Sequence, residues 1–112
     1  MKIANVALLS GTTGAATVNS SAVDSQFWQN VSVQAVATGT FAGTLAIQGS
    51  NDPAGATPSN WTDVASTSAT VNSSTSYLKT FSNQPYQWLR VSLTSGTGSG
   101  TISARLVAFG YR

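Results

Sequence analysis

The 112-residue chain contains no histidine, no cysteine and no glutamate. It therefore cannot form a disulfide, a thiol nucleophile, an imidazole base or a zinc site of the usual kind. Its only carboxylate side chains are the isolated Asp24, Asp52 and Asp63, whereas acid–base catalysis needs paired or environment-tuned titratable groups. These absences predict a protein that is not an enzyme and that holds no metal and no cofactor.

Charge of either sign is also scarce. Charged residues make up 7% of the chain, against about 25% in an average soluble domain. Five basic residues and three acidic ones give a net charge of +2. Five scattered cations make a poor track for phosphates, which argues against a nucleic-acid partner. The longest apolar runs fall far short of the ~20 residues that span a bilayer, which argues against a membrane partner.

Serine and threonine fill much of the space that charge leaves, with 17 and 15 residues. Valine, isoleucine and aromatic residues recur among them, and these types fit a pleated, half-buried surface. Short alternating runs separated by Gly, Ser, Asn and Pro clusters are typical of an all-β domain. We predict one antiparallel β-sandwich over residues 1–112, of jelly-roll or immunoglobulin-like type with about eight strands. A small barrel is the alternative.

Four runs with a period of two give the predicted strands their faces. Residues 28–37 are followed by residues 43–49, and residues 86–93 are followed by residues 101–108. Each pair is expected to form a hairpin, with Arg90 and Arg105 on the polar faces of the second pair. The residues expected to be buried and to face one another are Val33, Leu45, Ile47, Leu89, Val91, Ile102 and Leu106.

Residues 49–60 are rich in Gly, Pro, Asn and Asp, which predicts a surface loop. Asn51, Asp52 and Asp63 suggest an oxygen-ligand calcium site. The interpretation that we favour is a turn, because Asn and Asp before Pro initiate turns through bonds from side chain to backbone.

The three tryptophans also allow two interpretations. Trp28, Trp61 and Trp88 have the ring type that stacks on sugars in carbohydrate-binding modules. Aromatic residues also fill sandwich cores and subunit interfaces, with the indole N–H bonded to a nearby acceptor. We favour packing over ligand stacking.

The stretch GTLAIQGSNDP, followed by WTDV and then by YQWLRVSLTSGTGSGTISARL, resembles a pattern in small structural proteins of tailed bacteriophages. In that pattern a hairpin that ends in a GSND turn precedes a tryptophan strand, and a YRWLRV…SGSGTL-like hairpin closes the domain. The resemblance covers about residues 41–106. It implies a β-sandwich virion component, such as a head decoration (cement) protein or a tail protein, and it transfers no catalytic residue.

Low charge favours the same function, because the cores of protein interfaces are depleted in charge. We therefore expect a non-enzymatic virion protein that binds the major capsid protein on the outside of the head. We expect it to associate with copies of itself, for example as a trimer, and to stabilise the shell. The alternatives are a carbohydrate-binding or host-adhesion module, or a tail or connector component.

The apolar N-terminal segment is the predicted contact surface. Ile3, Val6, Leu8 and Leu9 lie in a stretch with Lys2 as its only charge. Terminal segments are ordered when they pair with a sheet edge or with another chain. Residues 1–15 are therefore expected to form either an extended arm that contacts a subunit or capsid, or an ordinary first strand.

Overall fold

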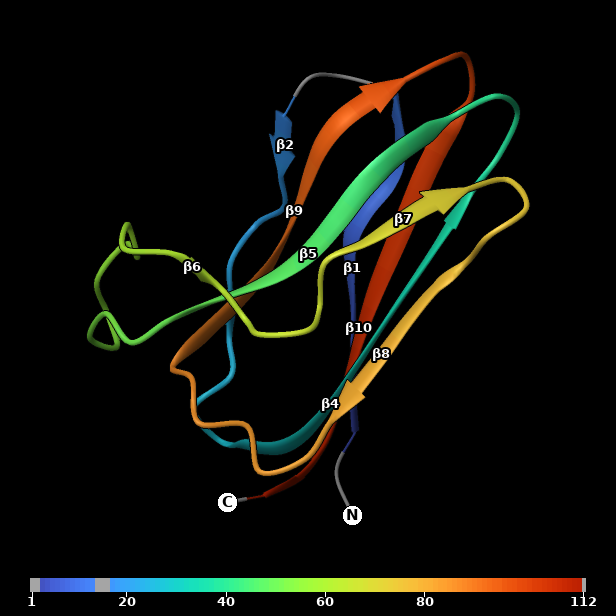
Figure 1. The fold of residues 1–112 in the computed structure, drawn as a ribbon. Coiled ribbons are helices and arrows are strands. Elements are labelled where there is room, and N and C mark those ends of the chain that lie inside the picture. The colour runs from blue at the N-terminus through green and yellow to red at the C-terminus, as the bar shows by residue number, and fades with distance from the viewer. Residues whose placement is uncertain (1–2, 14–16, 112) are drawn as a thin grey trace.

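The computed structural model describes residues 3–13 and 17–111 of the chain. Within these residues the regular structure consists of β-strands, which form two antiparallel sheets packed face to face (Figure 1). The strands are β1 (Ile3–Thr13), β2 (Thr17–Asn19), β3 (Val23–Asp24), β4 (Trp28–Ala37), β5 (Ala42–Ser50), β6 (Thr62–Asp63), β7 (Ala69–Asn72), β8 (Tyr77–Phe81), β9 (Trp88–Thr97) and β10 (Thr101–Tyr111).

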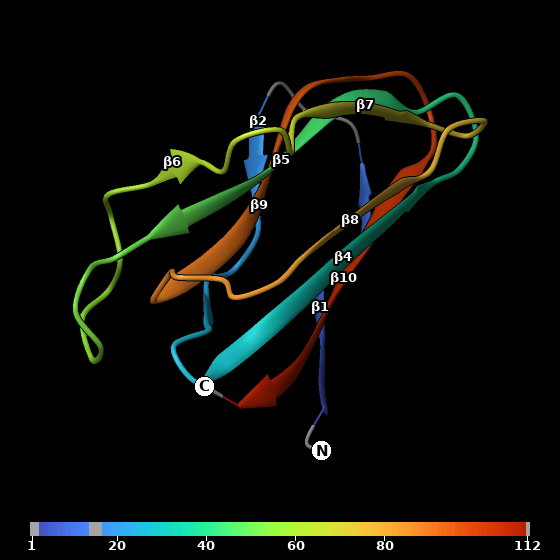
Figure 2. The same ribbon diagram turned by 60° about the horizontal axis from the view of Figure 1, so that its bottom comes forward.

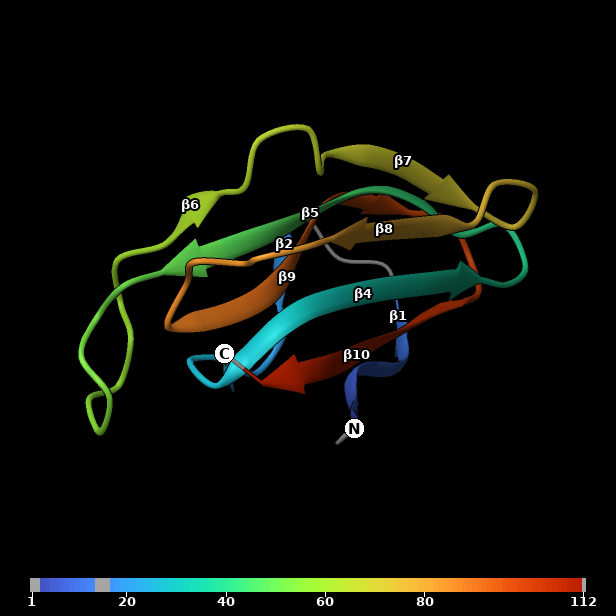
Figure 3. The ribbon, with the colours of Figure 1, turned by 90° about the horizontal axis from the view of Figure 1, so that it is seen from below.

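The segments fill eight rows, four in each sheet. Sheet A has the order β1-β10-β4-β8. Sheet B has the order β2-β9-β5-β6, in which β3 continues the row of β2 along β9 and β7 continues the row of β6 along β5. Figures 2 and 3 show β4 and β10 in one layer, with β5 and β9 in the other. The predicted antiparallel sandwich of about eight strands is confirmed.

The connections identify the sandwich as a jelly roll. The chain passes from one sheet to the other at every step between rows except the step from β5 to β6, which are neighbours in sheet B. Two four-row sheets linked in this way make a jelly roll. An immunoglobulin-like sandwich instead keeps its first two strands together in one sheet.

The two predicted hairpins are wrong. β4 pairs with β10 and β8, and β5 pairs with β9, β6 and β7, so β4 and β5 belong to different sheets. The same is true of β9 and β10, which places Arg90 and Arg105 on opposite sides of the molecule. Alternation identifies which face of a strand is buried. It does not identify the sheet, because the strand that follows a short turn can pack against the core from the same sheet or from the opposite one.

The two crossing turns, from β4 to β5 and from β9 to β10, are joined to each other. The amide of Thr40 donates to the carbonyl of Ser99 at 2.7 Å, and the amide of Ser99 donates to Thr40 Oγ1 at 2.7 Å. The amide of Thr38 donates to the carbonyl of Thr101 at 2.9 Å. Each turn thereby satisfies polar groups that the other would leave without a sheet partner.

Two glycines make this approach possible. Gly98 and Gly100 have φ values of 80° and 115°, which side chains rarely allow. A Cβ atom at Gly98 would lie 2.1 Å from the carbonyl oxygen of Thr40, and one at Gly100 would lie 2.1 Å from that of Thr38. Both the backbone angles and the space therefore require glycine.

We predict that Gly98→Ala lowers the free energy of unfolding by more than about 2 kcal/mol, because strain in φ adds to a steric clash. Gly55→Ala is the matched control, since Gly55 also has a positive φ of 84° but has nothing within 4 Å of its Cβ position. Urea unfolding of both variants measures the difference. Equal losses would contradict the close contact between the turns.

The core lies between the two sheets, where the inward faces of their strands meet. All seven predicted core residues are buried and belong to one cluster, so their predicted faces are confirmed. Phe41, Val71 and Tyr77 complete the cluster from shorter segments. Leu8 and Leu9 are both buried although they are adjacent, because a register shift in β1 between Ala7 and Leu9 turns both toward the core.

Both outer rows of sheet B are interrupted, and a buried hydroxyl group lies at each interruption. Between β2 and β3, the Ser20 amide donates to the carbonyl of Val91 at 2.9 Å, and the Val91 amide donates to Ser20 Oγ at 3.0 Å. Between β6 and β7, the amide of Ile47 donates to Thr67 Oγ1 at 3.1 Å. The hydroxyls thus complete the ladders of the central strands β9 and β5.

Thr67 is held in place by its own neighbours. Its hydroxyl lies 2.7 Å from the carbonyl oxygen of Val64, to which it donates, and its carbonyl accepts the hydroxyl proton of Tyr77 at 2.6 Å. Burial raises the pKa of Tyr77 to about 12. The tyrosine therefore remains a hydrogen-bond donor throughout the neutral and mildly alkaline range.

One buried glutamine joins the chain segments at the other end of the sandwich. Gln84 Nε2 donates to the carbonyls of Ser25 at 2.6 Å and Trp28 at 2.9 Å, and Gln84 Oε1 accepts the amide of Tyr86 at 2.9 Å. These bonds tie the turn before β4 to the crossing between β8 and β9.

Candidate interaction surfaces

The loop after β5 is closed by a single carboxylate. Asp52 accepts the backbone amides of Ser59 at 2.7 Å and Asn60 at 3.0 Å, and the side-chain amide of Asn60 at 2.9 Å. Asp63 instead accepts from Gln48 Nε2 at 2.9 Å. Asp52 thus bonds to backbone amides, as the sequence favoured, but these bonds close a loop onto residues 59 and 60 instead of initiating a local turn. Within the described residues, no three acidic side chains come together as a potential metal site.

These hydrogen bonds stabilise the ionised form of Asp52. They lower its pKa from 3.8 to about 2, and the side-chain bond from Asn60 is the largest cause. A carboxylate with a lowered pKa in the folded state stabilises that state above its unfolded pKa, and this contribution is lost as the pH falls through the folded pKa.

We predict that the Asp52 carboxyl titrates with a midpoint near pH 2, and that its contribution to stability disappears between about pH 4 and pH 2. Carboxyl ¹³C chemical shifts measured by NMR report this midpoint directly. Asn60→Ala removes the strongest donor and should move the midpoint back toward 3.8. A wild-type midpoint near 4 would show that the loop is not closed on this carboxylate.

A chain of polar contacts crosses the outer face of sheet B beside the loop. Gln48 Nε2 donates to Asp63, and Gln48 Oε1 accepts from Arg90 Nε at 2.8 Å. The Arg90 guanidinium lies over the ring of Trp61, 4.3 Å from its centroid, within cation–π range. Partial burial lowers the pKa of Arg90, and arginine stays ionised nonetheless. This contact fixes Trp61, the residue at which the loop returns to the sheet.

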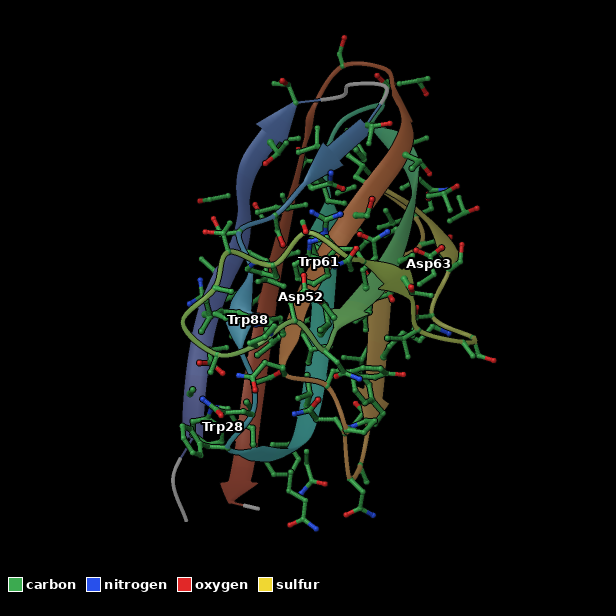
Figure 4. All side chains as sticks on the ribbon, turned by 90° about the vertical axis from the view of Figure 1, so that its left-hand side faces the viewer. Trp28, Asp52, Trp61, Asp63 and Trp88 are labelled. Atoms are coloured by element: carbon green, nitrogen blue, oxygen red, sulfur yellow. The ribbon has the colours of Figure 1, made fainter. Side chains whose placement is uncertain are left out.

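The structure brings two of the three tryptophans to this loop. Trp88 Nε1 donates to the carbonyl of Asp52 at 3.0 Å, and Trp61 is stacked with Arg90. Trp28 begins β4 in sheet A and packs against the core, toward one end of the molecule (Figure 4). All three side chains are partly buried. The rings therefore do not form a common three-ring platform.

The outer face of sheet A has a different character. Among the residues whose side chains the structure describes, its larger apolar members are Val36 and Leu78, with 47% and 62% of their surface exposed, and the half-buried Val107 and Phe109. Among the described residues, Arg105 carries the only charge on this face, and its Nε donates to Asn5 Oδ1 at 2.8 Å. We call this set of five side chains, Val36, Leu78, Arg105, Val107 and Phe109, the sheet A face.

The predicted N-terminal contact segment lies at the edge of sheet A. Residues 3–13 form β1, so the first-strand alternative describes them. Leu8 and Leu9 face the core, and Val6 is half-buried against it. Ile3 lies opposite Phe109 in the strand register. The segment therefore offers a strand edge, while its leucines are packed within the subunit.

Sequence reasoning missed the polar partners that shape these surfaces, Gln48 and Asn5 among them. Both stand at outward positions of alternating strands, as many other polar residues do. Gln48 lies opposite Arg90, and Asn5 lies two residues from Ala7, the residue opposite Arg105, only because of the strand register. The register between strands distant in sequence would have been needed to find them.

No protein-family profile and no curated protein sequence matches this chain. Comparison with solved structures does find matches. The crystal structure of the SPBc2 prophage-derived protein YomS matches with a TM-score of 0.67 and 7% identity, over 96% of this chain and 92% of that chain. A structure of the infectious bursal disease virus Gx strain matches with a TM-score of 0.45 and 12% identity, over 96% of this chain and 31% of that chain. Within the described residues, no helix is long and apolar enough to cross a membrane.

Proposed function

We propose that the protein is a structural component of a bacteriophage virion, and specifically a decoration protein that binds the outside of the head. The observation that carries the proposal is the sheet A face, which is partly apolar and without a carboxylate among the described residues. Contact with the major capsid protein through this face is the function that suits it best.

The fold supports a phage origin. YomS is a prophage-derived protein, and its chain matches this one over nearly its whole length. Jelly rolls are common in viral capsid proteins, and they also occur in lectins. A fold by itself does not identify a function. The chemical character of the surface is therefore needed to decide between a capsid role and sugar binding.

The surface favours protein contact over sugar binding. A sugar platform needs free aromatic faces, whereas Arg90 lies against one face of Trp61 and Trp28 lies in the other sheet. The sheet A face instead offers exposed aliphatic groups, an aromatic ring and one arginine, and aromatic and arginine side chains are enriched at interfaces. Polar side chains lie among them, such as Ser32, Gln34 and Ser103. With 7% charged residues, an isolated domain has little electrostatic protection against association.

A decoration protein acts through mass action. Each bound copy favours the assembled shell, because the site that it binds exists on the shell and not on the separated capsid subunits. This function requires no catalytic group, metal or cofactor.

We predict that purified virions contain this protein in a copy number comparable with that of the major capsid protein, as measured by quantitative mass spectrometry. Leu78→Lys should reduce this occupancy at least tenfold. A tenfold loss corresponds to about 1.4 kcal/mol of binding free energy, and burying an unpaired ammonium group in the contact costs more than that. Thr70→Lys, at an exposed position of β7 on sheet B, is the matched control and should leave the occupancy unchanged.

Other outcomes would overturn the proposal in distinct ways. A few copies per particle, located in the tail, would identify a tail or connector component. Absence from virions, together with specific retention on a glycan array, would identify an adhesion module. Equal loss of binding in both lysine variants would show that the sheet A face is not the contact.

A further inference from the structure

We propose that the first half of β1, residues 3–7, is a self-pairing edge, at which two copies of the chain join their A sheets through antiparallel strands. The inference goes beyond the proposed function, because it concerns a contact between copies that does not need a capsid. It follows from comparing the four outer rows of the sandwich.

An outer strand exposes unpaired backbone groups that can pair with another chain, and proteins usually block such edges. Sheet B blocks both of its own. One outer row is divided into β2 and β3, with three and two residues, and the other into β6 and β7, with two and four. Segments this short offer little backbone to an incoming strand.

The β8 edge of sheet A is blocked by charge. In this five-residue strand, Leu78 and Thr80 are exposed, whereas Lys79 stands opposite Val33 on the inward-facing side. To reach solvent, the ammonium group of Lys79 has to extend from between the two sheets past the unpaired edge of β8. It would therefore meet any strand that paired with β8, and inward-pointing charges are a recognised means of preventing edge pairing.

The remaining edge belongs to β1, and only its second half is blocked. Register shifts occur between Ala7 and Leu9 and between Leu9 and Thr12, and Gly11 has a φ of 58°. Such bulges twist an edge away from a partner. Residues 3–7 pair with β10 in unbroken register, and no described strand covers their other side. They include no charge and no proline.

The sequence of residues 3–7, IANVA, suits pairing with itself. A two-fold axis at Asn5 would place Ile3 opposite Ala7 of the partner subunit and Ala4 opposite Val6 of the partner subunit. Each larger residue then meets a smaller one, and such alternation favours interdigitation. The side-chain amide of Asn5 would meet the identical side-chain amide of Asn5 of the partner subunit, and each of them can both donate and accept a hydrogen bond. A two-fold contact of this kind is self-complementary.

Arg105 is the nearest described charge, and its guanidinium group reaches from β10 to the side chain of Asn5 on β1. In the proposed pair, the two guanidinium groups approach the axis from opposite sides, and their repulsion weakens the contact. This repulsion is screened as the ionic strength rises. A five-residue pairing is also smaller than a standard stable interface, so we expect dimerisation at high protein concentration.

The absence of cysteine permits a direct test. Asn5→Cys places one thiol at the proposed axis, where paired Cα atoms lie about 4.5–5.5 Å apart, within the range of a disulfide. Under mild oxidation at high concentration, this variant should form a disulfide-linked dimer at least tenfold faster than Thr80→Cys on the blocked β8 edge. Equal rates would overturn the proposal.

Sedimentation equilibrium of the cysteine-free protein supplies the second measurement. We expect a monomer–dimer equilibrium, and we expect Ala4→Lys to abolish it, because this lysine copies on β1 the inward charge that Lys79 provides on β8. A strictly monomeric wild type, or a trimer, would contradict two-fold edge pairing. If Ala4→Lys fails to fold, the cross-linking rates still decide. Both measurements omit the capsid. Edge pairing can therefore be disproved while the decoration function holds, and the decoration function can be disproved while edge pairing holds.

Discussion

Two hydroxyl groups complete the hydrogen bonding of sheet B, and the rest of the molecule depends on them. β9 and β5 are its central strands, and each requires a continuous partner on its outer side, because an unsatisfied buried amide costs about 1–3 kcal/mol. Neither has one, since both outer rows are interrupted. Ser20 and Thr67 supply the missing acceptors, for Val91 and Ile47. A short side chain therefore does at each interruption what a strand backbone does elsewhere.

The interruptions in turn shape the surfaces of the protein. They keep both edges of sheet B too short to pair with other chains, and the hydroxyl at Thr67 lets the chain leave β5 between β6 and β7 without a loss of ladder hydrogen bonds. With sheet B closed in this way, lateral contacts are left to sheet A. Its outer face is the proposed capsid contact, and its open β1 edge is the proposed contact between copies. The scarcity of charge suits both roles.

The sequence permits correct prediction where a local period determines the answer. The alternating faces of β4, β5, β9 and β10 follow from hydrophobic side chains at every second position, and the core residues follow from the faces. The partners of these strands could not be predicted in the same way. A short turn such as Thr38–Thr40 suits a hairpin as well as a crossing between sheets, and it crosses here because it hydrogen-bonds to a turn about sixty residues later. Ser20 and Thr67 look like any other members of a large set of serines and threonines, and their roles arise only from burial beside a central strand.

Amide hydrogen exchange in Thr67→Val measures whether the Thr67 hydroxyl completes the hydrogen bonding of sheet B. Valine keeps the shape and β-branching of threonine but removes the acceptor for the Ile47 amide. We expect a loss of about 1–3 kcal/mol in the free energy of unfolding and faster exchange at Ile47. Thr70→Val, at an exposed position of β7, should change stability by less than about 0.5 kcal/mol. If Thr67→Val leaves both stability and Ile47 exchange unchanged, the hydroxyl does not complete the sheet.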